Sequence, residues 1–258
     1  MAGYVQDAII LLGDSLTEGG TMPYGFCQQL IDAYNRKLDV LVRGLSGYNT
    51  TWVIPVFKQM LAPRTERTNR PKVQLLTIWF GANDSVFPGE PQHVPLAQFA
   101  VNLRTLVRLV RDPASAYYAP ETRVVLLTPP PINTHQLIHA LPHRDPPKYE
   151  LDRDSELTRR YAEAVVQVGR EERVPVVDTW TMLYDAVGQK EENMAKYLVD
   201  GIHLNTEAHK LVYAALVKTI KDEYPEIHYD NLEMVYPRWQ IINNDNYMEL
   251  LKTSSVRK

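Results

Sequence analysis

The sequence predicts a three-layer α/β/α sandwich built on a five-stranded parallel sheet, and two observations support this fold class. First, short apolar runs recur along the chain, each followed by a polar or glycine-rich break and then by a segment with helical periodicity. Second, the runs are continuously apolar rather than alternating. Continuous runs indicate strands that are buried on both faces, as in parallel sheets whose strands are joined by right-handed crossovers.

The predicted strands and helices alternate along most of the chain. Strands are expected at residues 8–12, 40–42, 73–80, 124–128 and 174–178. Helices are expected at residues 24–37, 52–61, 95–111, 155–173 and 206–222. In the fourth helix one face is apolar, which is typical of a surface helix packed on a core. Because no internal repeat or linker divides these units, residues 1–222 are expected to form one domain.

The composition is that of a folded globular protein and limits the classes of partner. The chain has 258 residues, of which 45% are hydrophobic and 23% charged, an ordinary balance for a globular domain. Its formal net charge is −3 and its basic residues are scattered, so no nucleic-acid-binding surface is predicted. No apolar run approaches the roughly 20 residues of a membrane span, and residues 1–10 lack the pattern of a signal peptide.

The single cysteine, Cys27, excludes an internal disulfide and a cysteine-based metal cluster. We expect it to be a small buried thiol, because it lies in a helical pattern with no histidine nearby in the sequence. One cysteine and no secretory signal together predict a cytoplasmic protein.

Candidate functional residues follow the apolar runs, because ligands bind at the carboxyl ends of the strands in open α/β sheets. The breaks after the first four runs read GDSLTEGG, RGLSGYNT, GANDS and PPPINTHQ, and VDGIHLN precedes the last helix. Four of these five breaks carry chemically competent groups. We expect them to converge at one edge of the sheet.

These breaks contain the groups that a serine hydrolase needs. Ser15 follows the first strand and is the candidate nucleophile, and its own N–H can stabilise negative charge at a helix start. Asp200 and His203 are three residues apart, close enough for the carboxylate to hold the imidazole ring. Asn83 offers an uncharged amide donor, and Gly47 offers a backbone N–H that no side chain obstructs.

The turn after the first strand also has a simpler interpretation, in which Ser15 or Thr17 is the N-cap of a helix. In that case Asp14 would form hydrogen bonds to the loop around it. The cap and the nucleophile are compatible roles, because a helix N-terminus favours negative charge beside it.

The blocks GDSLTE, GLSGYNT, GANDS and DGIHLN resemble, in this order and at these separations, those of the SGNH hydrolases, also called GDSL esterases. Four blocks in order are far more specific than a lone GDSL. The resemblance implies a flavodoxin-like fold, a catalytic triad of Ser15, Asp200 and His203, and an oxyanion hole formed by Ser15, Gly47 and Asn83. It also implies that neither a cofactor nor a metal is required.

Longer stretches, YNRKLDVLVRGLSGYNTTWVIPV and FGANDSVFPGEPQHVPLAQFAVNLRTLV, and the ending around YPRW, are similar to the eukaryotic isoamyl acetate-hydrolysing esterases. This similarity implies a carboxylic ester hydrolase acting on short-chain, acetate-type esters. A lysophospholipase or acyl-thioesterase with the same triad remains an alternative, as does a catalytically silent ligand-binding module. The expected partner is a small-molecule ester, without nucleic acid or membrane insertion, and a homodimer is one option for the assembly.

Other candidate signatures have weaker support. The sequence nearest to G-x-S-x-G, residues 44–48, ends in tyrosine, so Ser46 is expected to be a loop residue rather than a nucleophile. His135 and His139 have the i, i+4 spacing of metal ligands. Prolines flank them, however, and we expect residues 129–149 to form a lid or wall over the substrate pocket.

Three further aromatic residues are expected to be structural. Trp52 and Trp79 lie near the ends of the predicted second and third strands, and we expect both to pack in the core rather than to line a pocket. His209 lies in the last predicted helix and is expected to be a surface or partly packed residue.

The C-terminal part, residues 223–258, belongs to no strand–helix unit. Residues 224–251 carry more apolar area than a solvated tail could leave in water. We expect this C-terminal arm to pack on the domain or on a partner subunit, with residues 236–239 as its anchor, and to help close the pocket. Roughly the last eight residues are expected to be a disordered tail.

Overall fold

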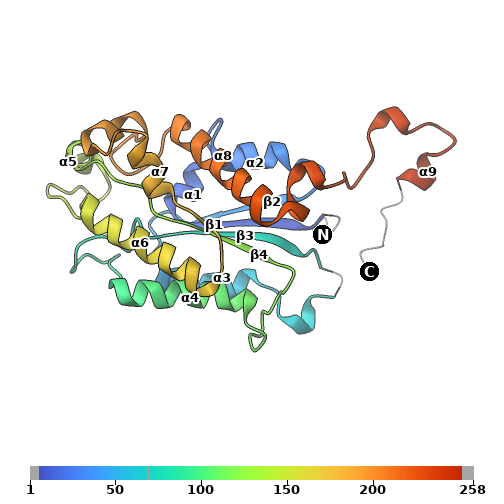
Figure 1. The fold of residues 1–258 in the computed structure, drawn as a ribbon, viewed down its shortest axis with the longest axis horizontal. Coiled ribbons are helices and arrows are strands. Elements are labelled where there is room, and N and C mark those ends of the chain that lie inside the picture. The colour runs from blue at the N-terminus through green and yellow to red at the C-terminus, as the bar shows by residue number, and fades with distance from the viewer. Residues whose placement is uncertain (1–5, 69, 252–258) are drawn as a thin grey trace.

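The computed structural model describes residues 6–68 and 70–251 and confirms the three-layer sandwich (Figure 1). Five strands form one sheet in the order β2-β1-β3-β4-β5, and each neighbouring pair is parallel. The chain crosses from β1 to one side for β2 and to the other side for β3, so the strand order reverses at the carboxyl end of β1. The strands are β1 (Ala8–Gly13), β2 (Asp39–Gly44), β3 (Val73–Trp79), β4 (Arg123–Leu127) and β5 (Val176–Val177).

Helices cover both faces of the sheet (Figure 1). On β1, Ile9 and Leu11 point into the core beneath α2 and α8, whereas Ile10 and Leu12 point into the core beneath α3, α4 and α6. The two cores explain why the strands read as continuous apolar runs. The helices are α1 (Ser15–Gly19), α2 (Phe26–Ala33), α3 (Thr50–Met60), α4 (Leu96–Arg111), α5 (Thr134–Ala140), α6 (Ser155–Glu172), α7 (Thr179–Asp185), α8 (Thr206–Glu223) and α9 (Tyr247–Leu250).

Asparagine and aspartate side chains fix where many of these helices begin. The N-caps of α3, α6 and α8 each accept a hydrogen bond from a backbone N–H in the first turn, and they are Asn49, Asp154 and Asn205. Asn133 and Asp178 cap α5 and α7 in the same way. These last two helices were not predicted, because seven residues are too few to establish a helical period.

Two strands differ from their predictions, one in burial and one in length. β2 is an edge strand, and its residues are partly exposed. β5 is shorter than predicted because only two of its residues pair with β4. The sheet is therefore best covered around β1, β3 and β4, and the loops that follow β1 and β3 lie beside each other.

The remaining single-residue predictions have mixed outcomes. Trp79 is fully buried as expected, and its Nε1 donates to a backbone carbonyl 2.8 Å away. Trp52 is instead 42% exposed, so its assignment to the core was wrong. His209 is buried, contrary to a surface position, and burial lowers its pKa to about 4. Cys27 is buried as predicted, and burial raises the pKa of this thiol to about 12.

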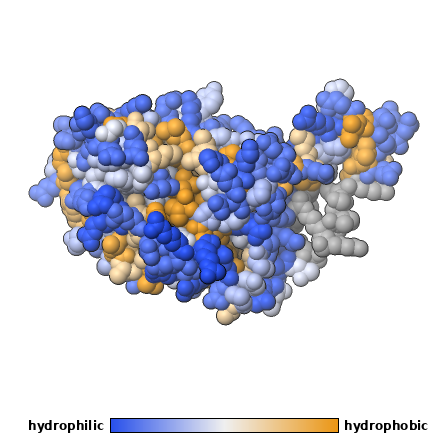
Figure 2. Space-filling model, viewed as in Figure 1, coloured by the Kyte–Doolittle hydropathy of each residue, from blue (hydrophilic) through white to orange (hydrophobic). Residues whose placement is uncertain are grey.

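The C-terminal arm follows α8. Its first part lies against the end of α2, where the Tyr34 hydroxyl donates to the Ile227 carbonyl at 3.0 Å and the Val235 amide donates to the Arg36 carbonyl at 2.8 Å. Its second part extends away from the sheet in Figure 1, carries apolar residues on its surface in Figure 2, and includes Trp239, which is 78% exposed. That the whole arm packs on a body stays a prediction. The expected tail falls mostly on residues 252–258, outside the described residues.

Among the helices in the described ranges, none is both long and apolar enough to cross a membrane.

Candidate active site

The first candidate residue, Ser15, lies in the turn that leaves β1. This turn is tightly packed, because a side chain on Gly13 would place a carbon 2.1 Å from the Thr17 hydroxyl and 2.7 Å from the Trp79 carbonyl. Asp14 is the N-cap of α1, and its carboxylate accepts a hydrogen bond from the Leu16 amide at 2.9 Å. The expectation that Ser15 or Thr17 caps this helix was wrong. Ser15 is instead the first residue of α1.

The structure links Ser15 to His203 and Asp200 by two hydrogen bonds. The Ser15 hydroxyl lies 2.9 Å from Nε2 of His203, and Nδ1 of His203 lies 2.8 Å from Oδ2 of Asp200. When Nδ1 carries the ring proton and donates a hydrogen bond to Asp200, Nε2 is free to accept a proton from the serine hydroxyl. Residues 188 positions apart in the sequence thus meet at one edge of the sheet, as predicted.

Asp200 lies in the turn before α8, and its carboxylate is held by backbone amides of the same turn. Its Oδ1 accepts the amides of Ile202 and His203 at 3.0 and 2.9 Å. Burial raises the pKa of Asp200, but the hydrogen bonds and the charge of the His203 ring outweigh burial and hold this pKa well below its usual range. The carboxylate is therefore ionised at neutral pH and stabilises a protonated imidazole.

Gly47 and Asn83 lie in two loops that are joined to each other. Nδ2 of Asn83 donates to the carbonyl of Tyr48 at 2.9 Å, next to Gly47. Gly47 has a φ of +78°, a conformation that favours glycine, and its carbonyl accepts from Nε2 of Gln92 at 2.7 Å. The two loops that were expected to supply oxyanion donors therefore form one hydrogen-bonded unit.

The Gly47 loop is also tied to the turn that holds Ser15. The amide of Leu45 donates to the Gly13 carbonyl at 2.9 Å, and the amide of Ser46 donates to the Glu18 carboxylate at 2.9 Å. Ser46 thus belongs to a loop beside α1, as expected. Together these bonds fix the loops of Ser15, Gly47 and Asn83 relative to one another.

Two buried aspartates, Asp14 and Asp84, support these loops. The sequence analysis expected Asp14 to form hydrogen bonds to its loop, but it gave Asp84 no role. Asp84 accepts the amide and the hydroxyl of Thr50 at 2.9 and 2.5 Å, which joins α3 to the Asn83 loop. Burial raises the pKa of Asp84 to about 6 and that of Asp14 to about 7. Asp14 directly follows β1 and Asp84 lies in the GANDS block that follows β3, and these positions were the available signal.

We expect Asp14→Asn to stabilise the protein at alkaline pH. Oδ2 of Asp14 is buried and has no hydrogen-bond partner within the described ranges. Burial is the main cause of the rise in its pKa from 3.8 to about 7, so the folded state binds more protons than the unfolded state between these values. Stability from this group is therefore present below pH 4 and is lost as the pH rises to 7. At pH 8 the variant should gain on the order of 1–3 kcal/mol in the free energy of unfolding, measured by urea denaturation.

The gain should disappear at pH 4, where Asp14 is protonated. Asp178→Asn is a matched control, because Asp178 also caps a helix but accepts several hydrogen bonds, including one from the Thr181 hydroxyl at 2.7 Å. A gain for Asp14→Asn that is equal at pH 4 and pH 8 would contradict the assignment of a buried charge.

The segment of residues 129–149 contains α5 and a 3₁₀ turn, Leu141–His143. His135 and His139 both lie on α5. Within the described part of the chain, no group of three or more histidine, cysteine, aspartate or glutamate side chains could hold a metal ion. That this segment covers a substrate pocket stays a prediction, but it brings Arg144 to within 3.0 Å of Oδ2 of Asp200. No motif in this proline-rich segment pointed to Arg144.

Known proteins are similar to this chain in sequence and in fold. Residues 11–211 match the model of the GDSL-like Lipase/Acylhydrolase family. The chain is 32% identical over 243 residues to the isoamyl acetate-hydrolyzing esterase 1 homolog of Bos taurus, covering 92% of this chain and 89% of that protein. It is 26% identical to the isoamyl acetate-hydrolyzing esterase of Saccharomyces cerevisiae, covering 93% and 96%.

The fold is also similar to that of a solved structure, a lipase/acylhydrolase from Enterococcus faecalis. The TM-score is 0.58 at 20% identity, and the match covers 88% of this chain and 98% of that one. The family model spans most of the sheet and includes the GDSL, GAND and DGIH blocks. The chain therefore belongs to the GDSL-like lipase/acylhydrolase family of serine ester hydrolases.

Proposed function

We propose that this chain hydrolyses short-chain, acetate-type carboxylic esters such as isoamyl acetate, with Ser15 as nucleophile. The observation that carries this proposal is the pair of hydrogen bonds from Ser15 to His203 and from His203 to Asp200. The names of the cow and yeast relatives, which cover most of the chain, support the choice of ester.

In the proposed first step, Nε2 of His203 removes the hydroxyl proton while Oγ of Ser15 attacks the ester carbonyl carbon. The negative oxygen that forms would be held by the amides of Ser15 and Gly47 and by the side chain of Asn83. His203 then gives its proton to the departing alcohol, which leaves an acyl group on Ser15. Water, activated by the same histidine, releases the acid and restores the hydroxyl.

The ionised state of Asp200 supports this cycle at neutral pH. Its carboxylate faces the positive charge that the imidazole gains in each half of the reaction. Because Asp200 is already fixed by two backbone amides, it need not rearrange when that charge forms.

A panel of p-nitrophenyl esters from acetyl to palmitoyl tests the substrate class, run beside isoamyl acetate, a lysophospholipid and an acyl-CoA. We expect kcat/KM to be highest for acetyl to butyryl esters. A preference for acyl chains of about ten carbons or more would favour a lysophospholipase instead. Faster cleavage of the acyl-CoA would favour a thioesterase, and no hydrolysis at all would favour a silent ligand-binding module.

The proposed setting of this activity includes three further expectations. A cytoplasmic location and assembly as a homodimer both stay predictions, as does pocket closure by the C-terminal arm. The apolar side chains on the second part of that arm support its packing against a further surface.

A further inference from the structure

Arg144 contacts the same carboxylate oxygen that faces the imidazole of His203. Its guanidinium donates to Oδ2 of Asp200 at 3.0 Å, and Nδ1 of His203 lies 2.8 Å from that oxygen. The side chains of Arg144 and Asp200 are 27% and 26% exposed, so about three quarters of each side chain is shielded from solvent. Asp200 therefore has a permanent cation on one side and the imidazole on the other.

A small apolar cluster holds the segment of Arg144 against the turn of Asp200. Ile132, Leu137, Leu141 and Ile202 are all buried in this cluster. Leu141 begins the 3₁₀ turn that leads to Arg144, and Ile202 lies between Asp200 and His203 in the sequence. Burial of Leu141 and Ile202 in the same cluster thus holds the segment of Arg144 beside the turn of Asp200.

The backbones of the two segments are also in direct contact. The amide of Asn133 donates to the Gly201 carbonyl at 2.9 Å. A side chain on Gly201, where φ is +90°, would place a carbon 2.6 Å from the Asn133 carbonyl and 2.6 Å from the Leu137 amide. Only glycine allows this approach, so the turn of Asp200 packs directly against the start of α5.

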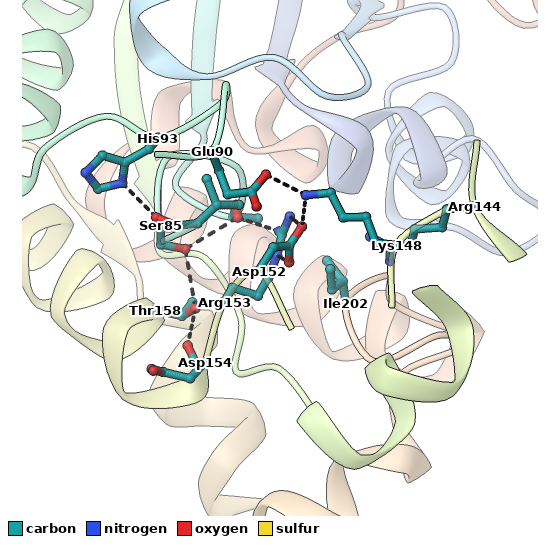
Figure 3. A network of polar contacts seen from close by, with 12 residues as sticks. Ser85, Glu90, His93, Arg144, Lys148, Asp152, Arg153, Asp154, Thr158 and Ile202 are labelled. Atoms are coloured by element: carbon teal, nitrogen blue, oxygen red, sulfur yellow. Dashed lines mark hydrogen bonds and ion pairs between the residues drawn. The ribbon is translucent and has the colours of Figure 1, made fainter. Parts of the chain in front are cut away.

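Beyond Arg144 the segment is fastened by an ion-pair network (Figure 3). Nζ of Lys148 lies 2.6 Å from the Glu90 carboxylate and 2.8 Å from that of Asp152. Asp152 in turn pairs with the buried Arg153 at 2.9 Å. The loop that carries Arg144 is therefore fixed at both of its ends.

We propose that Arg144 is a positioning residue that fixes the carboxylate of Asp200 and, through its charge, opposes the gain of a proton by the His203 ring. This inference rests on the proposed function of Ser15, His203 and Asp200. The positive charge opposes the arrival of a second positive charge on the ring, and the hydrogen bond to Oδ2 restricts rotation of the carboxyl group.

The groups that face the His203 ring are Ser15, Asp200 with Arg144 behind it, and the buried Asp14, whose charge interacts with the ring. Burial raises the pKa of Asp14 to about 7, so this group also affects the activity profile near neutral pH, but it is unchanged in every variant of Arg144. A shift between those variants therefore reports the charge at position 144.

Arg144→Met is expected to move the acidic midpoint of the kcat/KM profile on p-nitrophenyl acetate upward by about half a pH unit. The direction follows because loss of the cation favours the protonated ring, so a higher pH is needed to generate the base. We also expect kcat to fall roughly 3- to 10-fold, because the carboxylate that orients the His203 ring is no longer held by Arg144. KM should change little, because this ester carries no charge.

Two matched variants separate charge from packing. Arg144→Lys keeps the charge and should leave the midpoint within about 0.2 units of the wild type. Arg104→Met removes an arginine of similar exposure, 29%, from its ion pair with Glu171 between α4 and α6, and should leave both midpoint and kcat unchanged. If Arg144→Met does not fold, Arg144→Gln, which retains a donor but no charge, replaces it.

The titration of the His203 ring, followed by NMR in Ser15→Ala, gives the same comparison without catalysis. An equal midpoint with and without the Arg144 cation would overturn the proposal while leaving the proposed function intact. An equal shift in Arg144→Lys, or an effect confined to the KM of anionic esters, would also overturn it. Full esterase activity in Ser15→Ala would instead refute the proposed function, and the NMR midpoints would still decide the effect of Arg144.

Discussion

Ser15→Ala is expected to lower kcat/KM on p-nitrophenyl acetate by about 10⁴-fold or more and to abolish labelling by a fluorophosphonate. The hydroxyl of Ser15 is the group that Nε2 of His203 contacts at 2.9 Å, so its removal leaves the histidine without a proton to take. The fold should survive, because the cap of α1 belongs to Asp14. Activity, adduct mass and melting temperature, measured on the same preparation, check all three points.

Ser46→Ala is the matched control for this experiment. Ser46 lies in the loop that is tied to the Ser15 turn, but the contact is made by its backbone amide, which alanine retains. We expect full labelling and nearly full activity. An adduct on the Ser46 peptide, or labelling that persists in Ser15→Ala, would show that the nucleophile has been assigned to the wrong serine.

The fold could be predicted because its strands are buried on both faces and its main helices are long. β1 and β3 read as continuous apolar runs since each contributes side chains to two cores. The seven residues of α5 or α7 span about two turns, which is too short for a period to stand out. Their caps, Asn133 and Asp178, were the only local sign of a helix start.

The candidate site could be named from the sequence because parallel strands bring their carboxyl ends to one edge. That rule places Ser15 near residues far along the chain, and the spacing of Asp200 and His203 suits a single turn. The contact of Arg144 with Asp200 could not be predicted in this way. It depends on the cluster that buries Leu141 and Ile202 together, a tertiary arrangement of two irregular segments.

The identity of the helix cap was predicted incorrectly for a related reason. Serine, threonine and aspartate are all good N-caps, so GDSLT offers three candidates in four residues. The structure selects Asp14, which lies outside the helix and accepts the Leu16 amide at 2.9 Å, whereas Ser15 is already the first residue of α1. This choice depends on the backbone path out of β1, which the sequence pattern does not specify.

Asn83→Ala is expected to lower kcat by roughly 10²- to 10³-fold with a smaller change in KM. A side-chain amide has two N–H donors, and Asn83 uses one of them on the Tyr48 carbonyl at 2.9 Å. The bond to Tyr48 fixes the rotamer, and we expect the second N–H to meet the oxygen that becomes negative in the transition state. A donor aimed at developing charge affects kcat more than it affects ground-state binding.

Asn102→Ala separates this role from a loss of loop structure. Nδ2 of Asn102 donates to the hydroxyls of Thr50 and Thr51 at 3.0 and 2.9 Å, so both of its N–H groups serve the fold beside the same loops. This variant should lose stability but keep kcat within a few-fold of the wild type. Asn83→Asp, which keeps the shape but places acceptors where the donors were, should be at least as damaging as Asn83→Ala. A change confined to KM in Asn83→Ala would mean that the amide binds the substrate without stabilising the transition state, because only a donor that strengthens as charge develops lowers kcat.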